Sequence, residues 1–353
     1  NDGGGSGPSE TIELPRRAFS VIFMLRHAAG AARGGFEHVH SPRFVVSPAK
    51  EKLQTIVTAI GSVLIGKEAQ VQVALACLLA RGHLLIEDLP GMGKTTLANA
   101  MARVLGLEYN RVQFTSDLLP ADIVGVSVYE KSKAAFRFHP GPVFCQLLLA
   151  DEINRTTPKT QSALLEAMAE GQVTVEGETR ELPRPFFVIA TQNPVQYSGT
   201  FPLPESQLDR FLMRLSLGYP DLSSEKAILT GGDPRVRLRE LEPQLTIPEL
   251  LALQDEVDDI DVAEPVVDYV LRLLQFTRTS EDFEYGLSPR AALAILQSAK
   301  AIALLGGRRF VIPEDVQAVF PAVADHRLQG AGRGHDSGSR VLIEKVLDSV
   351  DVI

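Results

Sequence analysis

One segment of this 353-residue chain has the residue types and the order needed to bind phosphate groups. Residues 88–96 read Asp-Leu-Pro-Gly-Met-Gly-Lys-Thr-Thr, after an apolar run at 83–86 and before a helical pattern at 96–105. Strand, glycine turn and helix, in this order, are the context in which Gly-Lys-Thr forms a phosphate-binding loop. The glycines let backbone N–H groups close around phosphate oxygens, and the helix N-terminus adds partial positive charge.

Two side chains of this loop are expected to have specific roles. Lys94 can reach the β- and γ-phosphates of a nucleotide, and Thr95 can bind Mg²⁺. The other residues of the loop expected to contact the nucleotide are Pro90, Gly91, Met92, Gly93 and Thr96. The segment departs from the usual pattern at its start, where Asp88 stands in place of glycine. This departure concerns the way the chain enters the loop and leaves the phosphate contacts themselves unchanged.

Two further apolar runs end in polar residues that suit the same chemistry. The run at 146–152 ends in Asp151 and Glu152, and the run at 185–193 ends in Asn193. Such runs are typical of buried parallel strands, which present ligand-binding residues at their carboxyl ends. We expect Asp151 to hold Mg²⁺, mostly through water, and Glu152 to polarise the attacking water. Asn193 is expected to orient that water, on a strand beside that of Asp151. Taken alone, an Asp-Glu pair is usually solvated surface.

The elements that position these residues alternate between strand and helix as far as about residue 217. This alternation predicts an α/β fold with a parallel sheet sandwiched by helices. Beyond 219–221 only helices are expected, each beginning near a proline: 248–258, 265–278, 289–305 and 313–323. The length suits two domains. We predict an α/β nucleotide-binding core at 48–219 and an all-helical lid domain at 220–353.

Two segments alternate between apolar and polar residues, which predicts β-hairpins at 126–138 and 172–182. They are either functional insertions or inert decoration of the fold. Residues 1–47 are expected to be a disordered or extraneous N-terminal extension, which begins with a linker-like Gly-rich stretch. Its segment at 16–25, two arginines followed by an apolar run, superficially resembles a secretory signal, but the run is too short and Arg26 interrupts it.

Composition and residue spacing exclude several classes of function. The net charge of −9 argues against a surface for duplex nucleic acid, and no apolar run approaches the ~20 residues of a membrane span. Cys77 and Cys145 lie in apolar contexts and predict small core residues in a reducing compartment, the cytoplasm. His83 and His139 have no metal-ligand spacing, so structural roles are expected for both.

Several ordered motifs resemble the MoxR family of AAA+ ATPases. The resemblance extends over about residues 50 to 350, and its motifs keep the family's order and spacing. They are Phe114–Gly125, Phe138–Phe144, Leu147–Arg155, Thr156–Met168, Ala190–Pro194, Leu203–Phe211, Leu287–Leu293 and Val311–Val316. The resemblance implies Mg²⁺-dependent hydrolysis of ATP by a ring of subunits, with a hexamer as the expected assembly.

The resemblance also implies roles for particular residues. Asn193 corresponds to sensor 1, Arg210 to an arginine finger directed at a neighbouring subunit, and Arg290 to sensor 2, which contacts the γ-phosphate. A local pair with Asp209 is the alternative for Arg210, and a helix-end surface position is the alternative for Arg290. The adenine is expected near Ile65 and Gly66, which would bind it through their backbone.

The resemblance further implies chaperone-like remodelling of a client protein, with a von Willebrand factor A domain as the expected client. The two hairpins would line or cap the ring. Two other classes stay open: the ATPase motor subunit of a metal chelatase, and a nucleic-acid motor. The second rests on the basic residues Lys131, Lys133 and Arg137 of the first hairpin, which are equally typical of a solvated tip.

Overall fold

The computed structural model describes residues 48–193, 199–231, 233–331 and 339–352. The predicted extension at 1–47, Pro194 and most of the loop before the last helix lie outside the described residues. Residues 46–353 form one compact unit.

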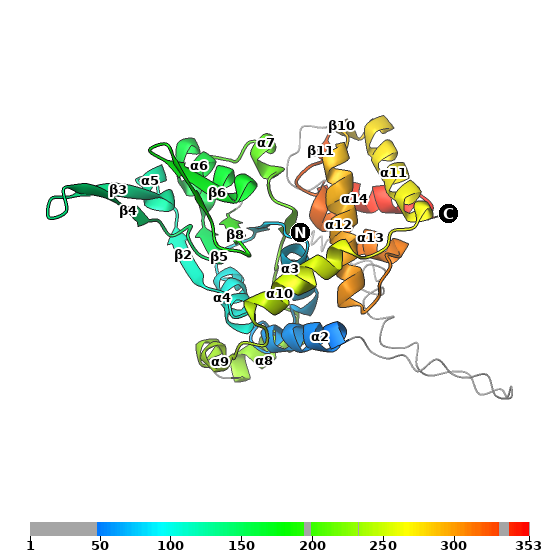
Figure 1. Cartoon of the computed structure of the whole chain (residues 1–353). Helices are drawn as coiled ribbons and strands as arrows, with labels where there is room; N and C mark the ends of the chain where they lie inside the picture. The colour runs from blue at the N-terminus through cyan, green and yellow to red at the C-terminus, as the bar shows by residue number, and fades with distance from the viewer. Residues whose placement is uncertain (1–47, 194–198, 232, 332–338, 353) are drawn as a thin grey trace, which may run out of the picture. The chain divides into compact units, whose positions relative to one another are not determined.

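A five-stranded parallel sheet forms the centre of the N-terminal half (Figure 1). Its order is β2-β5-β8-β1-β9. The strands are β1 (Leu84–Glu87), β2 (Tyr109–Gln113), β5 (Leu147–Asp151), β8 (Phe187–Gln192) and β9 (Met213–Leu215). The register pairs Leu149 with Ile189, which places β5 beside β8 as the sequence predicts. The α/β fold with a parallel sheet is confirmed.

Both faces of the sheet are buried, which explains the continuous apolar runs. Along β5, Leu147 and Leu149 belong to one core cluster, whereas Leu148 and Ala150 belong to a second cluster on the opposite face. The first cluster is shared with α2 (Pro48–Gly61), α3 (Glu68–Leu79) and α4 (Lys94–Val104), and the second with α5 (Pro120–Val124) and α6 (Pro158–Glu170). Each buried leucine contributes roughly 1.5–3 kcal/mol to this packing.

The C-terminal part is mainly helical. Its helices are α8 (Leu222–Thr230), α9 (Pro234–Glu240), α10 (Ile247–Asp258), α11 (Glu264–Thr279), α12 (Pro289–Leu305), α13 (Pro313–Ala324) and α14 (Ser339–Ser349). The expectation of helices alone is wrong in one detail, because β10 (Phe283–Tyr285) and β11 (Gln329–Gly330) form a small antiparallel ladder. Phe283 is buried there, which fixes this pairing against the helical core. Within the described ranges, no helix combines the length and apolarity that crossing a membrane requires.

The two predicted hairpins are present. One consists of β3 (Gly125–Glu130) and β4 (Ala135–Pro140), and it projects away from the sheet (Figure 1). The other consists of β6 (Gln172–Val175) and β7 (Glu178–Glu181). The guanidinium of Arg180 lies over the ring of Phe138, 4.0 Å from its centroid, so a cation–π contact joins the two hairpins.

Candidate functional site

The glycine loop connects β1 to α4 in the geometry that phosphate binding requires. Gly91 and Gly93 have φ angles of 87° and 97°, a region that side chains disfavour. No heavy atom lies within 4 Å of the position that a β-carbon of Gly91 would occupy, so the loop backbone is open on this side. The helix that begins at Lys94 directs its free N–H groups toward this loop.

Lys94 connects the loop to the strand next to β1. Its side chain is buried, and its Nζ donates to the carbonyl of Asp88 at 2.7 Å and to Oδ1 of Asn193 at 3.3 Å. Burial lowers the pKa of Lys94, while the nearby carboxylates of Asp88, Asp151 and Glu152 act in the opposite direction. The ammonium is therefore held by acceptors on two sides.

The two acidic residues at the end of β5 share one hydroxyl. Thr191 on β8 is fully buried, and its Oγ1 donates to Oδ1 of Asp151 at 2.6 Å and accepts from the N–H of Glu152 at 2.9 Å. Arg111 on β2 donates to the other oxygen of Asp151 at 2.7 Å. Glu152 has φ 58°, a left-handed conformation rarely adopted by residues with side chains and often found at functional sites.

The carboxylate of Glu152 is held by three neighbouring side chains. Asn193 donates from Nδ2 to Oε1 at 3.1 Å, and Gln113 at the end of β2 donates to Oε2 at 2.8 Å. Arg155 lies 3.0 Å from the same Oε2. Since the amide oxygen of Asn193 accepts from Lys94, this one side chain bridges the lysine of the loop and the carboxylate beyond β5.

The donor set suits Mg²⁺ bound together with a nucleotide. Thr95, in the first turn of α4, offers a hydroxyl, and Asp151 offers a carboxylate. Within the described ranges, no group of three or more acidic, histidine or cysteine side chains could hold a metal by itself. Mg²⁺ typically uses one or two protein ligands and completes its shell with phosphates and water, so these residues fit it. When bound, Mg²⁺ would neutralise charge on the phosphates.

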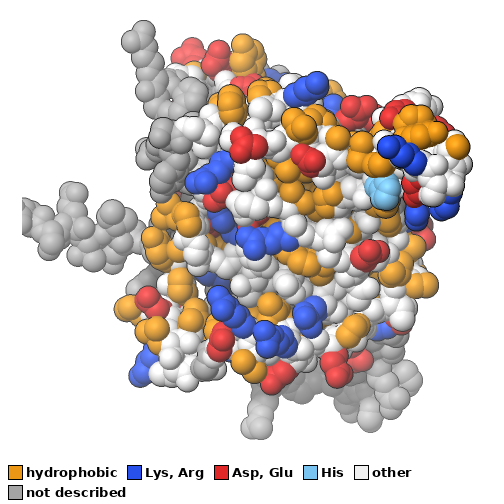
Figure 2. All heavy atoms as spheres, turned by 90° about the vertical axis from the view of Figure 1, so that its left-hand side faces the viewer, with side chains coloured by type: hydrophobic (Ala, Val, Ile, Leu, Met, Phe, Trp, Pro, Cys, Tyr) orange, Lys and Arg blue, Asp and Glu red, His pale blue; other side chains and the backbone are white. Residues whose placement is uncertain are grey.

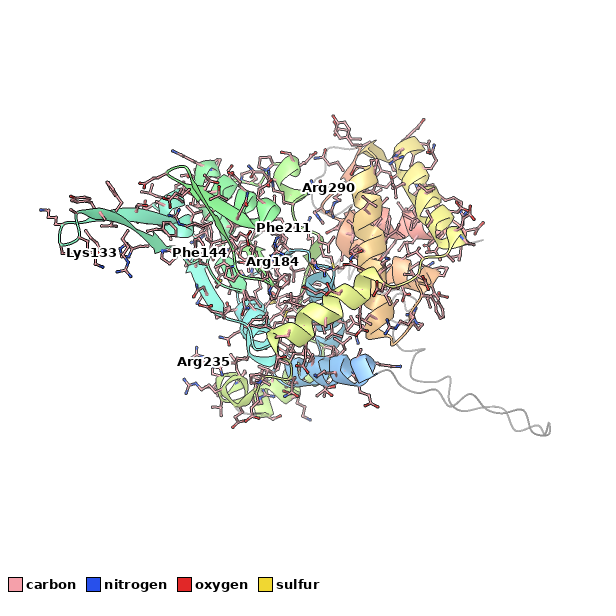
Figure 3. All side chains as sticks on the ribbon, viewed as in Figure 1. Lys133, Phe144, Arg184, Phe211, Arg235 and Arg290 are labelled. Carbon is pink, nitrogen blue, oxygen red and sulfur yellow. The ribbon has the colours of Figure 1, made fainter. Side chains whose placement is uncertain are left out.

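Of the two predicted arginines, Arg290 lies in a second cluster around one aspartate and Arg210 lies beside it. Asp209 follows α7 (Glu205–Leu208), and Arg290 near the start of α12 lies 3.2 Å from its Oδ2 (Figure 3). Arg327 is buried and donates to Oδ1 of Asp209 at 2.7 Å. Arg210 instead donates to the carbonyl of Leu165 at 2.8 Å. Asp209 therefore pairs with two arginines of the helical part, whereas Arg210 is held by α6.

The segment that is predicted to bind adenine lies against α8. Gly66 has φ 74°, and a β-carbon there would lie 2.2 Å from the hydroxyl of Ser224. Only glycine fits this close approach, which places the backbone of Ile65 and Gly66 beside the first turn of α8. The catalytic and nucleotide-binding roles of all the predicted residues stay predictions.

Sequence reasoning missed several residues that hold the acidic pair. Thr191 lies two positions before Asn193, so both side chains point to the same side of the chain. Gln113 ends β2 in register with Asp151. Gln113 could not be found from the sequence, because no apolar run marks the edge strand that it ends. Arg111 gave no signal, because an arginine on an edge strand is usually solvated.

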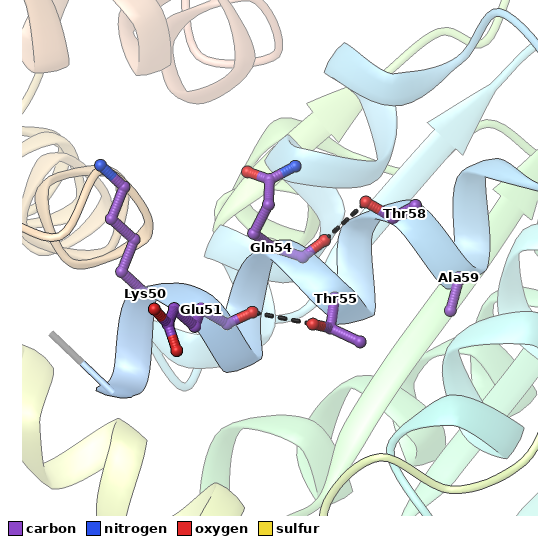
Figure 4. Close-up of a pocket in the computed structure, with 6 residues that line it drawn as sticks. All are labelled: Lys50, Glu51, Gln54, Thr55, Thr58 and Ala59. Atoms are coloured by element: carbon purple, nitrogen blue, oxygen red, sulfur yellow. Dashed lines mark hydrogen bonds between the residues drawn. The ribbon is translucent and has the colours of Figure 1, made fainter. Parts of the chain in front are cut away.

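A hollow on the outer side of α2 is not the site. It is lined by Lys50, Glu51, Gln54, Thr55, Thr58 and Ala59 (Figure 4). The hydroxyls of Thr55 and Thr58 donate to carbonyls of their own helix, at 2.9 and 2.8 Å. Both hydroxyls therefore already have partners, and the predicted phosphate-binding loop lies elsewhere, between β1 and α4.

The sheet order, the glycine loop, the acidic pair and the helical part together define an AAA+ ATPase. The family model described as "ATPase family associated with various cellular activities (AAA)" matches residues 83–213, and a model of the AAA lid domain matches residues 275–345.

Individual relatives identify the branch of this class. The chain is 43% identical to YeaC of Bacillus subtilis, over 83% of this chain and 92% of that protein. It is 38% identical to Chaperone MoxR1 of Mycobacterium tuberculosis, over 84% of each chain. A crystal structure of a candidate ATPase from Cytophaga hutchinsonii matches with a TM-score of 0.76 and 34% identity, over 86% of this chain and 95% of that chain. The chain belongs to the MoxR family of AAA+ ATPases, and it hydrolyses ATP.

The chelatase alternative has weaker support. The magnesium-chelatase subunit ChlI of Chlamydomonas reinhardtii is 28% identical over 67% of this chain and 55% of that protein. This distance supports common membership of the AAA+ class and carries no argument for chelatase activity.

Proposed function

We propose that this chain works as a ring, a hexamer, that uses ATP hydrolysis to remodel a client protein in a chaperone-like manner. The main support for the ATPase site is that the Asn193 side chain forms hydrogen bonds with both Lys94 and Glu152. Chaperone-like work is supported by the similarity to Chaperone MoxR1. The cytoplasm stays our prediction for its location, supported by two free, buried cysteines, Cys77 and Cys145.

In this proposal each residue of the site has one role. Lys94 and the loop backbone bind the β- and γ-phosphates of ATP, and Thr95 and Asp151 hold Mg²⁺. Glu152 polarises the attacking water, and Asn193 orients it between that carboxylate and the γ-phosphate. Arg290 acts on the γ-phosphate from the helical part, because a guanidinium matches the geometry of phosphate oxygens.

Two substitutions separate binding from turnover. Lys94→Ala removes the charge directed at the phosphates, so ATP should bind about 10- to 150-fold more weakly. Glu152→Gln keeps the Mg²⁺ ligands and removes the general base, so ATP should still bind while turnover falls roughly 10²- to 10⁴-fold. Equilibrium binding of ATP and steady-state phosphate release measure the two effects.

The matched control is Glu166→Gln on the exposed side of α6. This control makes the same chemical change away from the site and should leave both measurements at wild-type values. Normal turnover in Glu152→Gln would remove Glu152 from the mechanism.

We infer that the client contacts the two hairpins. Val126, Val128, Tyr129 and Phe136 of the β3–β4 hairpin are exposed, and the rings of Tyr129 and Phe136 pack edge to face at 5.3 Å. Figure 2 views the molecule from the side of this hairpin and shows hydrophobic side chains interspersed with charged ones of both signs. Exposed apolar groups of this kind are typical of protein interaction sites. A von Willebrand factor A domain is the client that we propose.

Two basic residues of this hairpin are paired with an acidic one, which favours a protein client over nucleic acid. Lys133 at the tip (Figure 3) and Arg137 both pair with Glu130, each at 3.2 Å. Glu130 offsets part of the positive charge that a phosphate backbone would need.

Nucleotide dependence tests the client proposal. If the client prefers the ATP state, its affinity for Glu152→Gln should be about 5- to 150-fold higher with ATP than with ADP. Changing both Tyr129 and Phe136 to serine should abolish this difference, whereas Leu271→Ser, at an exposed position on α11, should preserve it. Equal affinity with ATP, with ADP and without nucleotide would leave no coupling to drive remodelling. Preference for single-stranded DNA over the domain would favour a nucleic-acid motor.

A further inference from the structure

The chain between β9 and α8 is bound by the aspartate that replaces the first glycine of the loop. We call residues 216–219 the hinge segment, because they connect the sheet to the helical part. Oδ2 of Asp88 accepts from the N–H of Leu217 at 2.5 Å, from the N–H of Gly218 at 2.9 Å and from the hydroxyl of Ser216 at 3.2 Å. One carboxylate oxygen therefore collects three donors of the hinge segment.

A buried lysine holds the carbonyls of the same segment. Nζ of Lys67 donates to the carbonyl of Leu217 at 2.6 Å and to that of Tyr219 at 2.7 Å. Lys67 and Asp88 are 7% and 9% exposed. Burying two charged groups is costly unless hydrogen bonds satisfy them, and here the hinge backbone supplies those bonds.

Asp88 also contacts the lysine of the ATPase site. Its backbone carbonyl accepts from Nζ of Lys94 at 2.7 Å, while its carboxylate holds the hinge segment. A glycine at this position would keep the first contact and lose the second. The usual loop sequence therefore has no equivalent of this connection.

We propose that Asp88 is a positioning residue that couples the phosphate-binding loop to the hinge segment, so that nucleotide at the loop sets the orientation of the helical part. The proposal rests on the proposed ATPase site and adds the route by which that site controls the helices. Lys67 holds the same segment through its carbonyls, as Asp88 does through its N–H groups. A rearrangement of the helical part that turns the backbone at Leu217 or Gly218 has to move or break the bonds to Asp88.

Amide hydrogen exchange of the whole chain tests this coupling directly. In the wild type, the amides of Leu217 and Gly218 should exchange slowly, and a non-hydrolysable ATP analogue with Mg²⁺ should change their rates. In Asp88→Gly both amides should exchange about 10- to 150-fold faster, the range for losing a hydrogen bond to a charged group. The analogue should then no longer affect them.

Steady-state kinetics gives the second readout. Asp88→Gly keeps the loop backbone, so KM for ATP should stay within about threefold of wild type, while kcat should fall roughly 2- to 30-fold because the coupling is lost. Asp88→Asn retains an acceptor oxygen, so its amide exchange rates and its kcat should lie between those of Asp88→Gly and the wild type.

Lys67→Met should also speed exchange of the Leu217 and Gly218 amides. Because both side chains hold the same segment, the double variant with Asp88→Gly should show a smaller increase than the sum of the two single effects.

The matched control is Asp233→Asn. Asp233 is an exposed carboxylate that accepts from the N–H of Arg235 at 2.8 Å and caps α9, a role that asparagine fills equally well. This control should leave hinge exchange and kcat unchanged. If Asp88→Gly does not fold, Asp88→Asn and Ser216→Ala, which removes one donor, provide the same comparison at smaller amplitude.

Wild-type exchange at Leu217 and Gly218 in the Asp88 variants would overturn the proposal, as would a wild-type kcat. Its failure is distinguishable from failure of the proposed function. Exchange is measured without turnover and without a client, whereas a wild-type chain that releases no phosphate would contradict the ATPase assignment alone.

Discussion

At the scale of single residues, the arrangement around Thr191 shows how the acidic pair is ordered. One buried hydroxyl serves both residues, as donor to Asp151 and as acceptor for the N–H of Glu152. A left-handed conformation such as that of Glu152 costs about 1–3 kcal/mol and persists only where the surroundings fix it. The hydroxyl of Thr191 supplies part of that constraint, so we assign this residue a positioning role.

Thr191→Val tests this role with a side chain of nearly the same shape. Loss of the hydroxyl leaves the N–H of Glu152 without its acceptor and Asp151 without one donor, so kcat should fall about 10- to 100-fold. KM for ATP should change less, because the loop is untouched. Thr191→Ser keeps the hydroxyl and should restore most of the rate. Phosphate release across an Mg²⁺ titration measures the rates of both variants. A wild-type rate in Thr191→Val would contradict the positioning role of Thr191.

At the scale of elements, strands with two buried faces were predictable from the sequence. β5 and β8 are continuous apolar runs, so their polar ends could be identified from the sequence alone. β2 lies at the sheet edge and is only partly buried, with arginine and glutamine among its residues, so no apolar run marks it. The bonds of Arg111, Gln113 and Asp88 are tertiary contacts between distant segments, and no local pattern encodes them.

His83 joins three of these elements, in line with the structural role expected from sequence. It precedes β1, its Nδ1 accepts from the N–H of Val188 on β8 at 3.1 Å, and its Nε2 lies 3.1 Å from the carbonyl of Met168 on α6. The first bond requires an unprotonated Nδ1, so the neutral ring with its proton on Nε2 satisfies both. Burial lowers the pKa of His83 from 6.5 to about 4.

This lowered pKa predicts a loss of stability in mild acid. Between pH 6.5 and about 4 the unfolded chain binds a proton on His83 that the folded chain excludes. The free energy of unfolding should therefore fall as pH falls through this window, by on the order of 3 kcal/mol from His83. Urea unfolding of His83→Gln should show a shallower decrease, while His139→Gln, at an exposed hairpin position, should keep the wild-type slope. Equal slopes in all three proteins would exclude His83 as the cause.

At the scale of the whole molecule, the arginines divide into two groups by what holds them. Arg290 and Arg327 converge on Asp209 and so connect the helical part to the segment after α7. Arg210, the next residue, has one bond to a backbone carbonyl and no aspartate partner within the described residues. A single acceptor of this kind leaves most of its guanidinium donors free for another partner. We propose that this partner is the γ-phosphate bound by a neighbouring subunit of the ring, a role that no single chain can display.

Mixing two inactive variants tests this role of Arg210. Arg210→Ala protomers keep an intact nucleotide site and should bind ATP almost normally, yet be inactive alone because no finger reaches any site. Lys94→Ala protomers lack the site but carry an intact Arg210. In a randomly mixed ring with equal amounts, about a quarter of the interfaces combine an intact site with an intact finger, so activity should partly return toward that fraction of wild type. The gain should appear only at concentrations where sedimentation shows rings. Mixed rings without recovered phosphate release would mean that Arg210 acts within its own chain, as an anchor to α6.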